Sequence, residues 1–243
     1  MTNPPAVIPS DRAPGLHIEP GVVIPADTVL APHVTIYAGV QIGDGVSLGQ
    51  GAILGRLQQI DPRSRSTRVG HGLTTQVGSG CHVGSGAVID AGATLLTGAR
   101  VGDAAVVRAA AVLEEECVLG WRSGVAYSGR VGRRTRIQNG VSIGPWTTIG
   151  ADVLISPGVT MVGDPTMGRR ERSECSPGAV LGRACRIGTS AILIPPVQIG
   201  EEAIVCAASL VRRDVAARTV VAGIPARFVR EVRDEELLEA WVQ

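Results

Sequence analysis

Aliphatic residues recur at every sixth position along most of the chain, in three runs that cover residues 18–54, 77–161 and 181–211. Within each hexad the fifth residue is small, as at Ala87 and Cys117. A period of six fits neither the turn of an α-helix nor the simple alternation of a long strand. The pattern therefore predicts short strands that are separated by sharp corners.

The hexads predict a narrow, triangular, parallel β-helix. The large aliphatic residue of each strand points inward and the small residue fits into a crowded corner, so that three hexads complete one coil. A narrow interior accepts Val, Ile and Leu but leaves little room for rings, which accounts for an aromatic content of only 2%. At the usual strand spacing, about eight coils would form an all-β prism about 40 Å long.

Two internal segments and the two ends of the chain depart from the repeat. Residues 55–76 and 162–180 are polar, rich in Arg and without the period, so we expect loops that leave a corner. Long loops on a rigid scaffold usually carry function. Residues 1–17 are expected to lead into a β-helix domain over residues 18–225. The charged tail, 226–243, has spaced apolar residues that predict an amphipathic helix capping the last coil.

Composition argues against several classes of protein. The 23 basic residues nearly balance 22 acidic ones, which gives a net charge of +1 and disfavours general binding to nucleic acid or to a membrane surface. The apolar runs are too short to span a bilayer. The N-terminus lacks the basic and apolar regions of a signal peptide, so we expect a cytoplasmic protein. Cys81, Cys117 and Cys185 occupy the small hexad position, which predicts packing rather than catalysis.

The most specific motif lies near the end of the repeat. Residues 199–205 (IGEEAIV), 212–215 (RRDV) and 222–227 (AGIPAR) resemble the ending of the hexapeptide-repeat acyltransferases, whose fold is a left-handed parallel β-helix. Asn139, in residues 137–141 (IQNGV), resembles the branch that acetylates amino groups of nucleotide-linked sugars. The resemblance implies acetyl-CoA as acyl donor, a homotrimer, and a groove for coenzyme A between neighbouring prisms.

The sequence departs from that family where its chemistry is expected. A related group places a catalytic His in a run that corresponds here to residues 112–120 (VLEEECVLG), where Glu115 stands in place of the His. The second loop begins with residues 162–165 (VGDP), and the stretch expected in the coenzyme A groove is 206–209 (CAAS). Acyl transfer to an amine also needs a group that accepts a proton, and both Asp164 and His82 are candidates.

The candidate site residues fall into three groups. Those that could position the reacting amine or accept its proton are Asp164, His82, Asn139 and Glu115. The resemblance implies that coenzyme A is bound by Ser190, Ala207, Ala208, Arg212, Arg213 and Arg227, and the arginines suit phosphate through their bidentate fork. The candidates for binding the acceptor are Trp146, Arg169, Glu174 and His71, and Trp121 also projects outward.

The leading interpretation is N-acyl transfer to a sugar, a nucleotide-linked sugar or another small amine. One alternative is a non-catalytic trimeric β-helix that assembles with or binds other molecules. Another is O-acetyl transfer to a small hydroxylated acceptor. A zinc carbonic anhydrase on the same fold would need a close pair of His ligands. His17, His33, His71 and His82 do not have that spacing, so we expect no metal.

Overall fold

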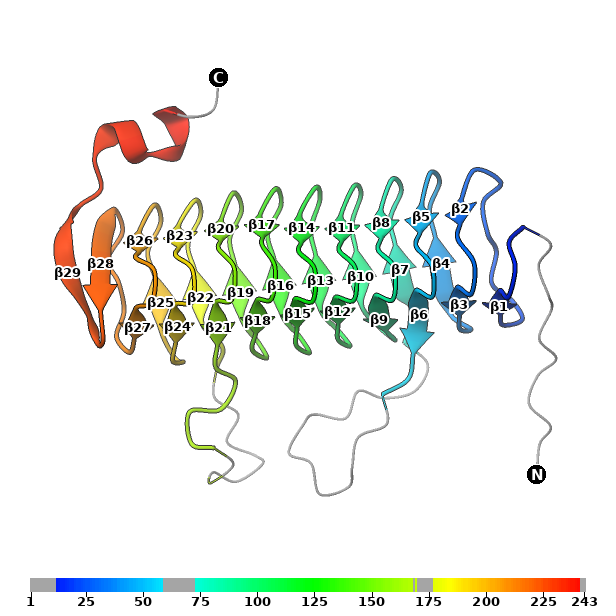
Figure 1. The fold of residues 1–243 in the computed structure, drawn as a ribbon, viewed down its shortest axis with the longest axis horizontal. Coiled ribbons are helices and arrows are strands. Elements are labelled where there is room, and N and C mark those ends of the chain that lie inside the picture. The colour runs from blue at the N-terminus through cyan, green and yellow to red at the C-terminus, as the bar shows by residue number, and fades with distance from the viewer. Residues whose placement is uncertain (1–11, 59–72, 168, 170–176, 241–243) are drawn as a thin grey trace.

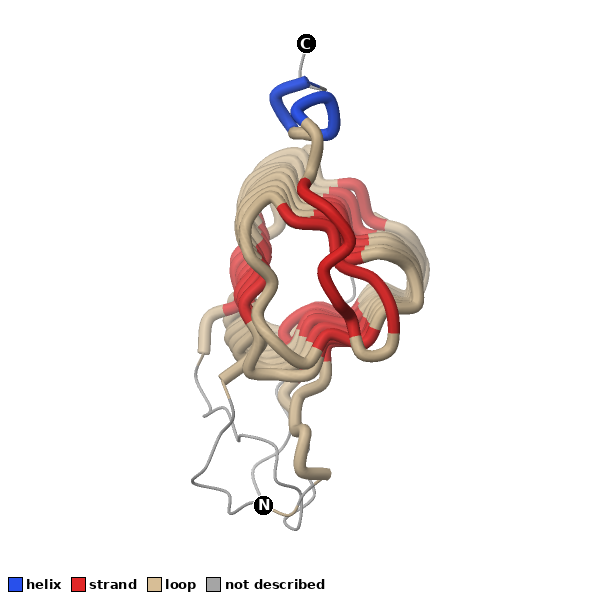
Figure 2. The backbone as a smooth tube through the Cα atoms, turned by 90° about the vertical axis from the view of Figure 1, so that its left-hand side faces the viewer, coloured by secondary structure: helices blue, strands red, loops and turns tan. Residues whose placement is uncertain are grey.

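The chain winds into a three-sided prism of stacked parallel coils. The computed structural model describes residues 12–58, 73–167, 169 and 177–240 (Figure 1). The view along the prism shows short strands on three faces, joined by turns (Figure 2). Equivalent strands pair in parallel register one coil apart, as Thr94 does with Val112 and Leu95 with Leu113. The parallel β-helix predicted from the hexads is thus confirmed.

Each face of the prism is one sheet, and the described residues form three sheets of ten, eight and eleven strands. Face 1 contains β1 (His17–Ile18), β3 (Thr35–Ile36), β6 (Ile53–Arg56), β9 (Val88–Asp90), β12 (Val106–Val107), β15 (Gly124–Val125), β18 (Ser142–Ile143), β21 (Thr160–Met161), β24 (Ile192–Leu193) and β27 (Leu210–Val211). Face 2 contains β4 (Val40–Ile42), β7 (Thr75–Val77), β10 (Thr94–Leu95), β13 (Val112–Leu113), β16 (Arg130–Val131), β19 (Thr148–Ile149), β22 (Val180–Leu181) and β25 (Gln198–Ile199). Face 3 contains β2 (Val29–Leu30), β5 (Ser47–Leu48), β8 (His82–Val83), β11 (Arg100–Val101), β14 (Val118–Leu119), β17 (Arg136–Ile137), β20 (Leu154–Ile155), β23 (Arg186–Ile187), β26 (Ile204–Val205), β28 (Thr219–Gly223) and β29 (Ala226–Glu231).

The faces meet at three edges, and each edge is a row of corners. The chain passes from face 1 to face 2 at the 1–2 edge, from face 2 to face 3 at the 2–3 edge, and from face 3 back to face 1 at the 3–1 edge. Both excursions leave from the 1–2 edge. The first follows β6 and returns at β7, and the second follows β21 and returns at β22. Figure 1 shows β6 and β21, from which the two excursions leave, on the lower side of the prism.

The interior is a continuous stack of aliphatic side chains. The inward residue of nearly every coil is buried, as at Leu95, Leu113 and Ile143. The small hexad position is buried as well, and burial raises the pKa of the Cys117 and Cys185 thiols to about 12. These thiols are therefore protonated at neutral pH and pack as small apolar groups.

Two features at the ends of the prism differ from the sequence prediction. Face 1 holds ten strands where about eight coils were expected, because pairing continues from β1 to β27 without a break at either excursion. The predicted capping helix over residues 226–243 is wrong. Its first part is β29, which pairs antiparallel with β28 and covers a strand edge that would otherwise be exposed.

The tail ends in two short 3₁₀ turns, η1 (Asp234–Glu236) and η2 (Leu238–Ala240). Arg230 donates hydrogen bonds to Glu236 at 2.6 and 2.7 Å, and the buried Glu202 accepts one from the Leu238 backbone N–H at 3.1 Å. These contacts hold the tail against the last coils. Within the described residues no helix is long and apolar enough to cross a membrane.

The aliphatic stack predicts that neighbouring residues of one strand differ strongly in how far a charged substitution destabilises the fold. Ile143 is 2% exposed, whereas Ser142 lies on the exposed side of the same strand. Ile143→Asp should destabilise the fold by at least about 3 kcal/mol because it buries an unpaired charge. Ser142→Asp is the matched control and should keep a near-native melting temperature. Equal melting temperatures for the two variants in a thermal denaturation series would contradict the inward assignment.

The Arg230 contact predicts an unusual titration at the tail. Hydrogen bonds from the Arg230 side chain, and then from the Arg233 backbone N–H, lower the pKa of Glu236 from 4.5 to about 2. A lowered pKa means that the contact stabilises the tail fully above pH 4.5 and is lost as the pH falls through about 2. Titration followed by carboxyl ¹³C shifts should give that midpoint. Arg230→Gln should move it towards 4.5, while Arg227→Gln should leave it unchanged, and a wild-type midpoint above 4 would refute the contact.

Candidate functional site

One continuous row of corner residues runs along the 3–1 edge. Successive coils are joined there by backbone hydrogen bonds from Gly158 to Asn139 at 3.0 Å, from Ser190 to Pro157 at 3.0 Å, and from Ala208 to Thr189 at 2.8 Å. The row thus brings Asn139 into line with three of the residues expected to bind coenzyme A, which are Ser190, Ala207 and Ala208. They come from separate hexads and meet because the coils stack in register.

The same row continues past the last coil to the hairpin between β28 and β29. The Gly223 backbone N–H donates a hydrogen bond to Ser209 Oγ at 3.2 Å, which ties the hairpin turn to the corner after Ala208. Arg227 lies opposite Ala222 in this hairpin and is exposed to solvent. The 3–1 edge therefore carries an arginine at its C-terminal end.

At the other end of the row, Asn139 lines a groove of about 630 Å³. The groove is formed by Asp103, Ala104, Trp121, Arg122, Asn139 and Gly140. Asn139 Oδ1 accepts a hydrogen bond from the Trp121 backbone N–H at 3.1 Å. That bond fixes the orientation of the carboxamide and does not use its NH₂ group. The Trp121 side chain is 60% exposed and offers an apolar ring beside Asn139.

The 1–2 edge gathers a second set of predicted residues. Arg212 and Arg213 follow β27 at this edge, and Asp164 lies in the second excursion. Asp164 Oδ1 accepts hydrogen bonds from the Thr166 backbone N–H at 2.7 Å and from Thr166 Oγ1 at 2.6 Å. The carboxylate therefore folds the start of its own loop, and the exposed Arg169 follows it.

Trp146 also lies at the 1–2 edge, one coil before the second excursion. Its ring packs edge-on against Tyr127 from the preceding coil, with 4.8 Å between ring centroids and a 90° angle between planes. Trp146 has φ of 53°, which is uncommon for a bulky residue. Trp146 and Tyr127 thus form an aromatic pair at this edge. His71 and Glu174, also predicted to bind the acceptor, lie outside the described residues.

His82 and Glu115 lie apart from both rows. His82 is half-buried in β8 on face 3, and its Nδ1 is 3.3 Å from Ser47 Oγ. Glu115 is exposed at the 2–3 edge, where Asp152 pairs with Arg134 at 2.7 Å and with Arg183 at 3.6 Å. The hydrogen bond from Arg134 lowers the pKa of Asp152. The four predicted catalytic side chains thus occupy different sides of the prism and do not meet within one chain.

A buried carboxylate at the 1–2 edge was missed by the sequence reasoning. Asp90 is completely buried and lies 2.9 Å from Arg56 Nη2 and 3.0 Å from Arg108 Nε. Arg108 follows Asp90 by one coil, so the coil period could have suggested that pair. The Arg56 contact spans the first excursion and could not be read from the period. No group of three or more His, Cys, Asp or Glu side chains in the described part of the chain could hold a metal ion.

The repeat itself is recognisable among known proteins. Residues 110–145 and 178–211 match the family described as "Hexapeptide repeat of succinyl-transferase". The hexapeptide repeat is thus recognised over these two stretches of the chain. The described residues form a parallel β-helix, the fold that the resemblance implied in its left-handed form.

The relatives of this hexapeptide-repeat chain include acetyltransferases with different acceptors. Galactoside O-acetyltransferase of Escherichia coli K12 is 34% identical over 93 residues, which cover 37% of this chain and 46% of that protein. The 2,3,4,5-tetrahydropyridine-2,6-dicarboxylate N-acetyltransferase of Enterococcus faecalis is 41% identical over 49 residues, covering 20% and 21%. A hexapeptide-repeat acetyltransferase of known structure from Vibrio cholerae is 31% identical over 48% of this chain and 74% of its own, with a TM-score of 0.39. The chain spans less than half the length of the curated relatives it matches.

Proposed function

We propose that this chain is an acyltransferase that uses acetyl-CoA and binds it along the 3–1 edge. The supporting observation is the continuous row from the groove at Trp121 and Asn139 to Ser190 and Ala208. Small corner residues leave space for an extended pantetheine chain, and stacked corners present backbone groups along it. Arg227 at the C-terminal end of the row suits a phosphate of the coenzyme. The thioester would then lie beside Asn139.

Asn139 is proposed to stabilise the reacting thioester. Attack by an amine converts the thioester carbonyl to an oxyanion, and a donor already aimed at that oxygen lowers the barrier. The bond between Asn139 Oδ1 and the Trp121 backbone N–H fixes the carboxamide, so its NH₂ group is held in place to donate. The thiolate of coenzyme A leaves when the intermediate collapses.

The active assembly is proposed to be a homotrimer with face 1 at its centre. The outward residues of face 1 are uncharged from β3 to β27 apart from Arg56 at the end of β6, whereas face 3 carries Arg100, Arg136 and Arg186. The uncharged outward residues are Thr35, Ile53, Val88, Val106, Gly124, Ser142, Thr160, Ile192 and Leu210. A charge-free face is the one that can be buried in an interface without the cost of desolvating unpaired charges.

This arrangement would complete each site from two chains. When face 1 of every chain faces the threefold axis, the 3–1 edge of one chain lies against the 1–2 edge of the next. Asn139 of one chain would then face the second excursion of its neighbour, which carries Asp164. Arg212 and Arg213, on the same neighbouring edge, would approach the coenzyme phosphates from the other side.

The acceptor is proposed to be an amino group on a sugar or another small amine. Asp164 is a weak base, and a carboxylate can take the proton of an amine that has already attacked more readily than it can activate a hydroxyl. The exposed Trp121 ring can pack against an acceptor ring, and Asp103 in the same groove can accept hydrogen bonds. The cytoplasmic location expected from the sequence stays a prediction.

Turnover of acetyl-CoA tests the proposed activity directly. Release of the coenzyme A thiol should accelerate with at least one member of a panel of amino sugars and small amines. The matching hydroxylated sugars form the comparison arm and would reveal O-acetyl transfer. Asn139→Ala should lower kcat about 100-fold, in the range of an oxyanion donor. Failure of every acceptor, together with no binding of acetyl-CoA in calorimetry, would favour a non-catalytic prism.

A complementation experiment tests whether two chains build one site. Asn139→Ala and Asp164→Asn should each be nearly inactive as homotrimers. In trimers that contain both variants, one of the three interfaces pairs two intact edges, so activity should return to about one third of wild type. No recovery in co-expressed, purified mixed trimers would refute the shared site.

His82→Ala, made in parallel, decides between the two candidate bases. His82 lies on face 3, away from the proposed interface, so this variant should keep its kcat. A loss of about 100-fold or more in His82→Ala, with Asp164→Asn fully active, would make His82 the base instead.

A further inference from the structure

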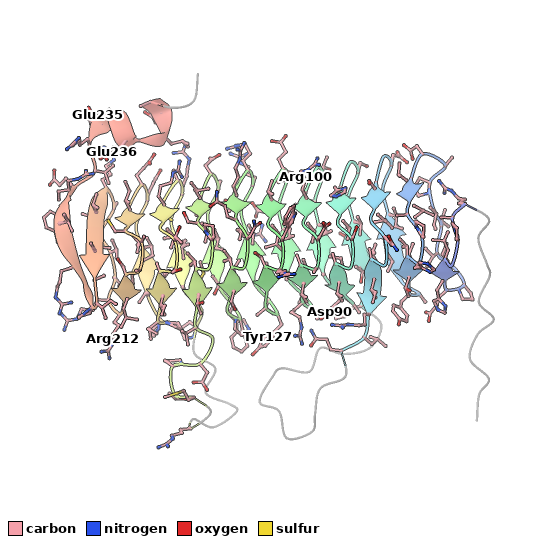
Figure 3. All side chains as sticks on the ribbon, in the orientation of Figure 1. Asp90, Arg100, Tyr127, Arg212, Glu235 and Glu236 are labelled. Carbon is pink, nitrogen blue, oxygen red and sulfur yellow. The ribbon has the colours of Figure 1, made fainter. Side chains whose placement is uncertain are left out.

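The first excursion begins beside a cluster in which one buried carboxylate holds two arginines. Arg56 donates from Nε and Nη2 to Asp90 Oδ1 at 3.0 and 2.9 Å. Arg108 Nε lies 3.0 Å from Asp90 Oδ2, and Gln58 Nε2 also donates to Oδ2. Figure 3 shows Asp90 at the lower edge of the prism, where the excursion begins. One carboxylate neutralises one guanidinium, so the cluster keeps a net positive charge.

An irregularity in the backbone of β6 positions this cluster at the corner. β6 continues past the usual corner to Arg56, and its register against β9 shifts between Leu54 and Arg56. Gly55 makes the shift with a φ of +78°, and a Cβ there would lie 2.5 Å from Val40 Cγ2. The bulge aligns Arg56 with Asp90. The chain thus departs from its repeat in a way that brings an arginine onto the buried acid.

Both arginines line a groove of about 1070 Å³. Their side chains remain 41% and 38% exposed although Asp90 is buried, so part of each guanidinium faces the groove. Leu57 and Leu73, 51% and 39% exposed, supply apolar wall, with Tyr37 nearby. Gln58 Oε1 is buried without a hydrogen-bond partner among the described residues. The groove therefore has an unused polar group at one end and apolar surface beside it.

We propose that this groove binds a small organic anion, with its carboxylate or phosphate at Arg56 and Arg108 and its apolar body against Leu57 and Leu73. Guanidinium groups recognise such oxyanions through paired N–H donors. Asp90 orients both arginines in advance, which reduces the ordering cost of binding. Glu19 lines the same groove and accepts a hydrogen bond from the Ala38 backbone N–H at 2.8 Å. Its charge disfavours a second anionic group, so the ligand carries one. This site does not depend on the proposed acyl transfer, and in the proposed trimer its edge would face the neighbouring chain.

Calorimetry with four simple probes tests the site. Phenyl phosphate and benzoate carry an apolar ring, whereas inorganic phosphate and acetate offer the anion alone. At least one ring-bearing probe should bind saturably, once per chain, and more tightly than its ring-free counterpart. If phenyl phosphate binds more tightly than benzoate, the natural ligand is a phosphate ester. If benzoate binds more tightly, the natural ligand is a carboxylate. Failure of both ring-bearing probes to bind wild type would overturn the proposal.

Two arginine variants separate binding from a purely structural role. Arg108→Gln should weaken the probe at least about tenfold because it removes one charged fork, while Arg100→Gln, an exposed arginine on face 3, should bind as wild type does (Figure 3). Arg108→Lys keeps the charge and the pairing with Asp90, so it carries the test if Arg108→Gln unfolds. It should melt near the wild-type temperature and still bind more weakly. Wild-type affinity in a folded Arg108→Gln or Arg108→Lys would overturn the proposal and leave the cluster a structural one.

Discussion

The close packing of one inward aliphatic residue on the next, coil after coil, is the interaction on which the rest of this structure depends. The stack holds Leu95, Leu113 and Val131 directly above one another on face 2, and parallel pairing keeps that register. Because the interior is narrow and fully packed, a shift of one residue would expose the whole stack. Every corner is consequently held at a fixed height along the prism.

Fixed corners turn a one-dimensional repeat into three straight rows of side chains. Residues one coil apart in sequence become neighbours, so the 3–1 edge aligns Asn139 with Ser190 and Ala208. The same stacking separates residues that are close in sequence, since consecutive corners lie on different edges. Asn139 and Trp146 are near in the chain, yet they occupy the 3–1 and 1–2 edges. A site on this fold is thus built along an edge, or between edges of two prisms.

Charged side chains are distributed unevenly among the faces and edges of the prism. Ion pairs such as Arg134 with Asp152 connect successive coils at the 2–3 edge, and face 1 is left without outward charges over most of its length. Exposed pairs of this kind contribute little to the free energy of folding individually. Their main consequence is that the sides of the prism that carry them remain exposed to solvent. Asp90 is the exception, because its charge is fully buried and needs both Arg56 and Arg108 as partners.

The sequence by itself determined the repeat, the parallel coils, the inward and small positions, and the place of both excursions. A period of six imposes these features because each hexad repeats the same local packing, whatever lies further away. Tertiary structure decided what depends on contacts between distant coils or at the ends. The tail around Phe228 became a strand rather than a helix because the last coil offered an open edge for pairing. Asp90 pairs with Arg56, which lies on the other side of the first excursion in the sequence. The predicted catalytic residues lie on separate sides of the prism. Neither arrangement could be predicted, because the pattern within one hexad does not specify contacts between distant hexads.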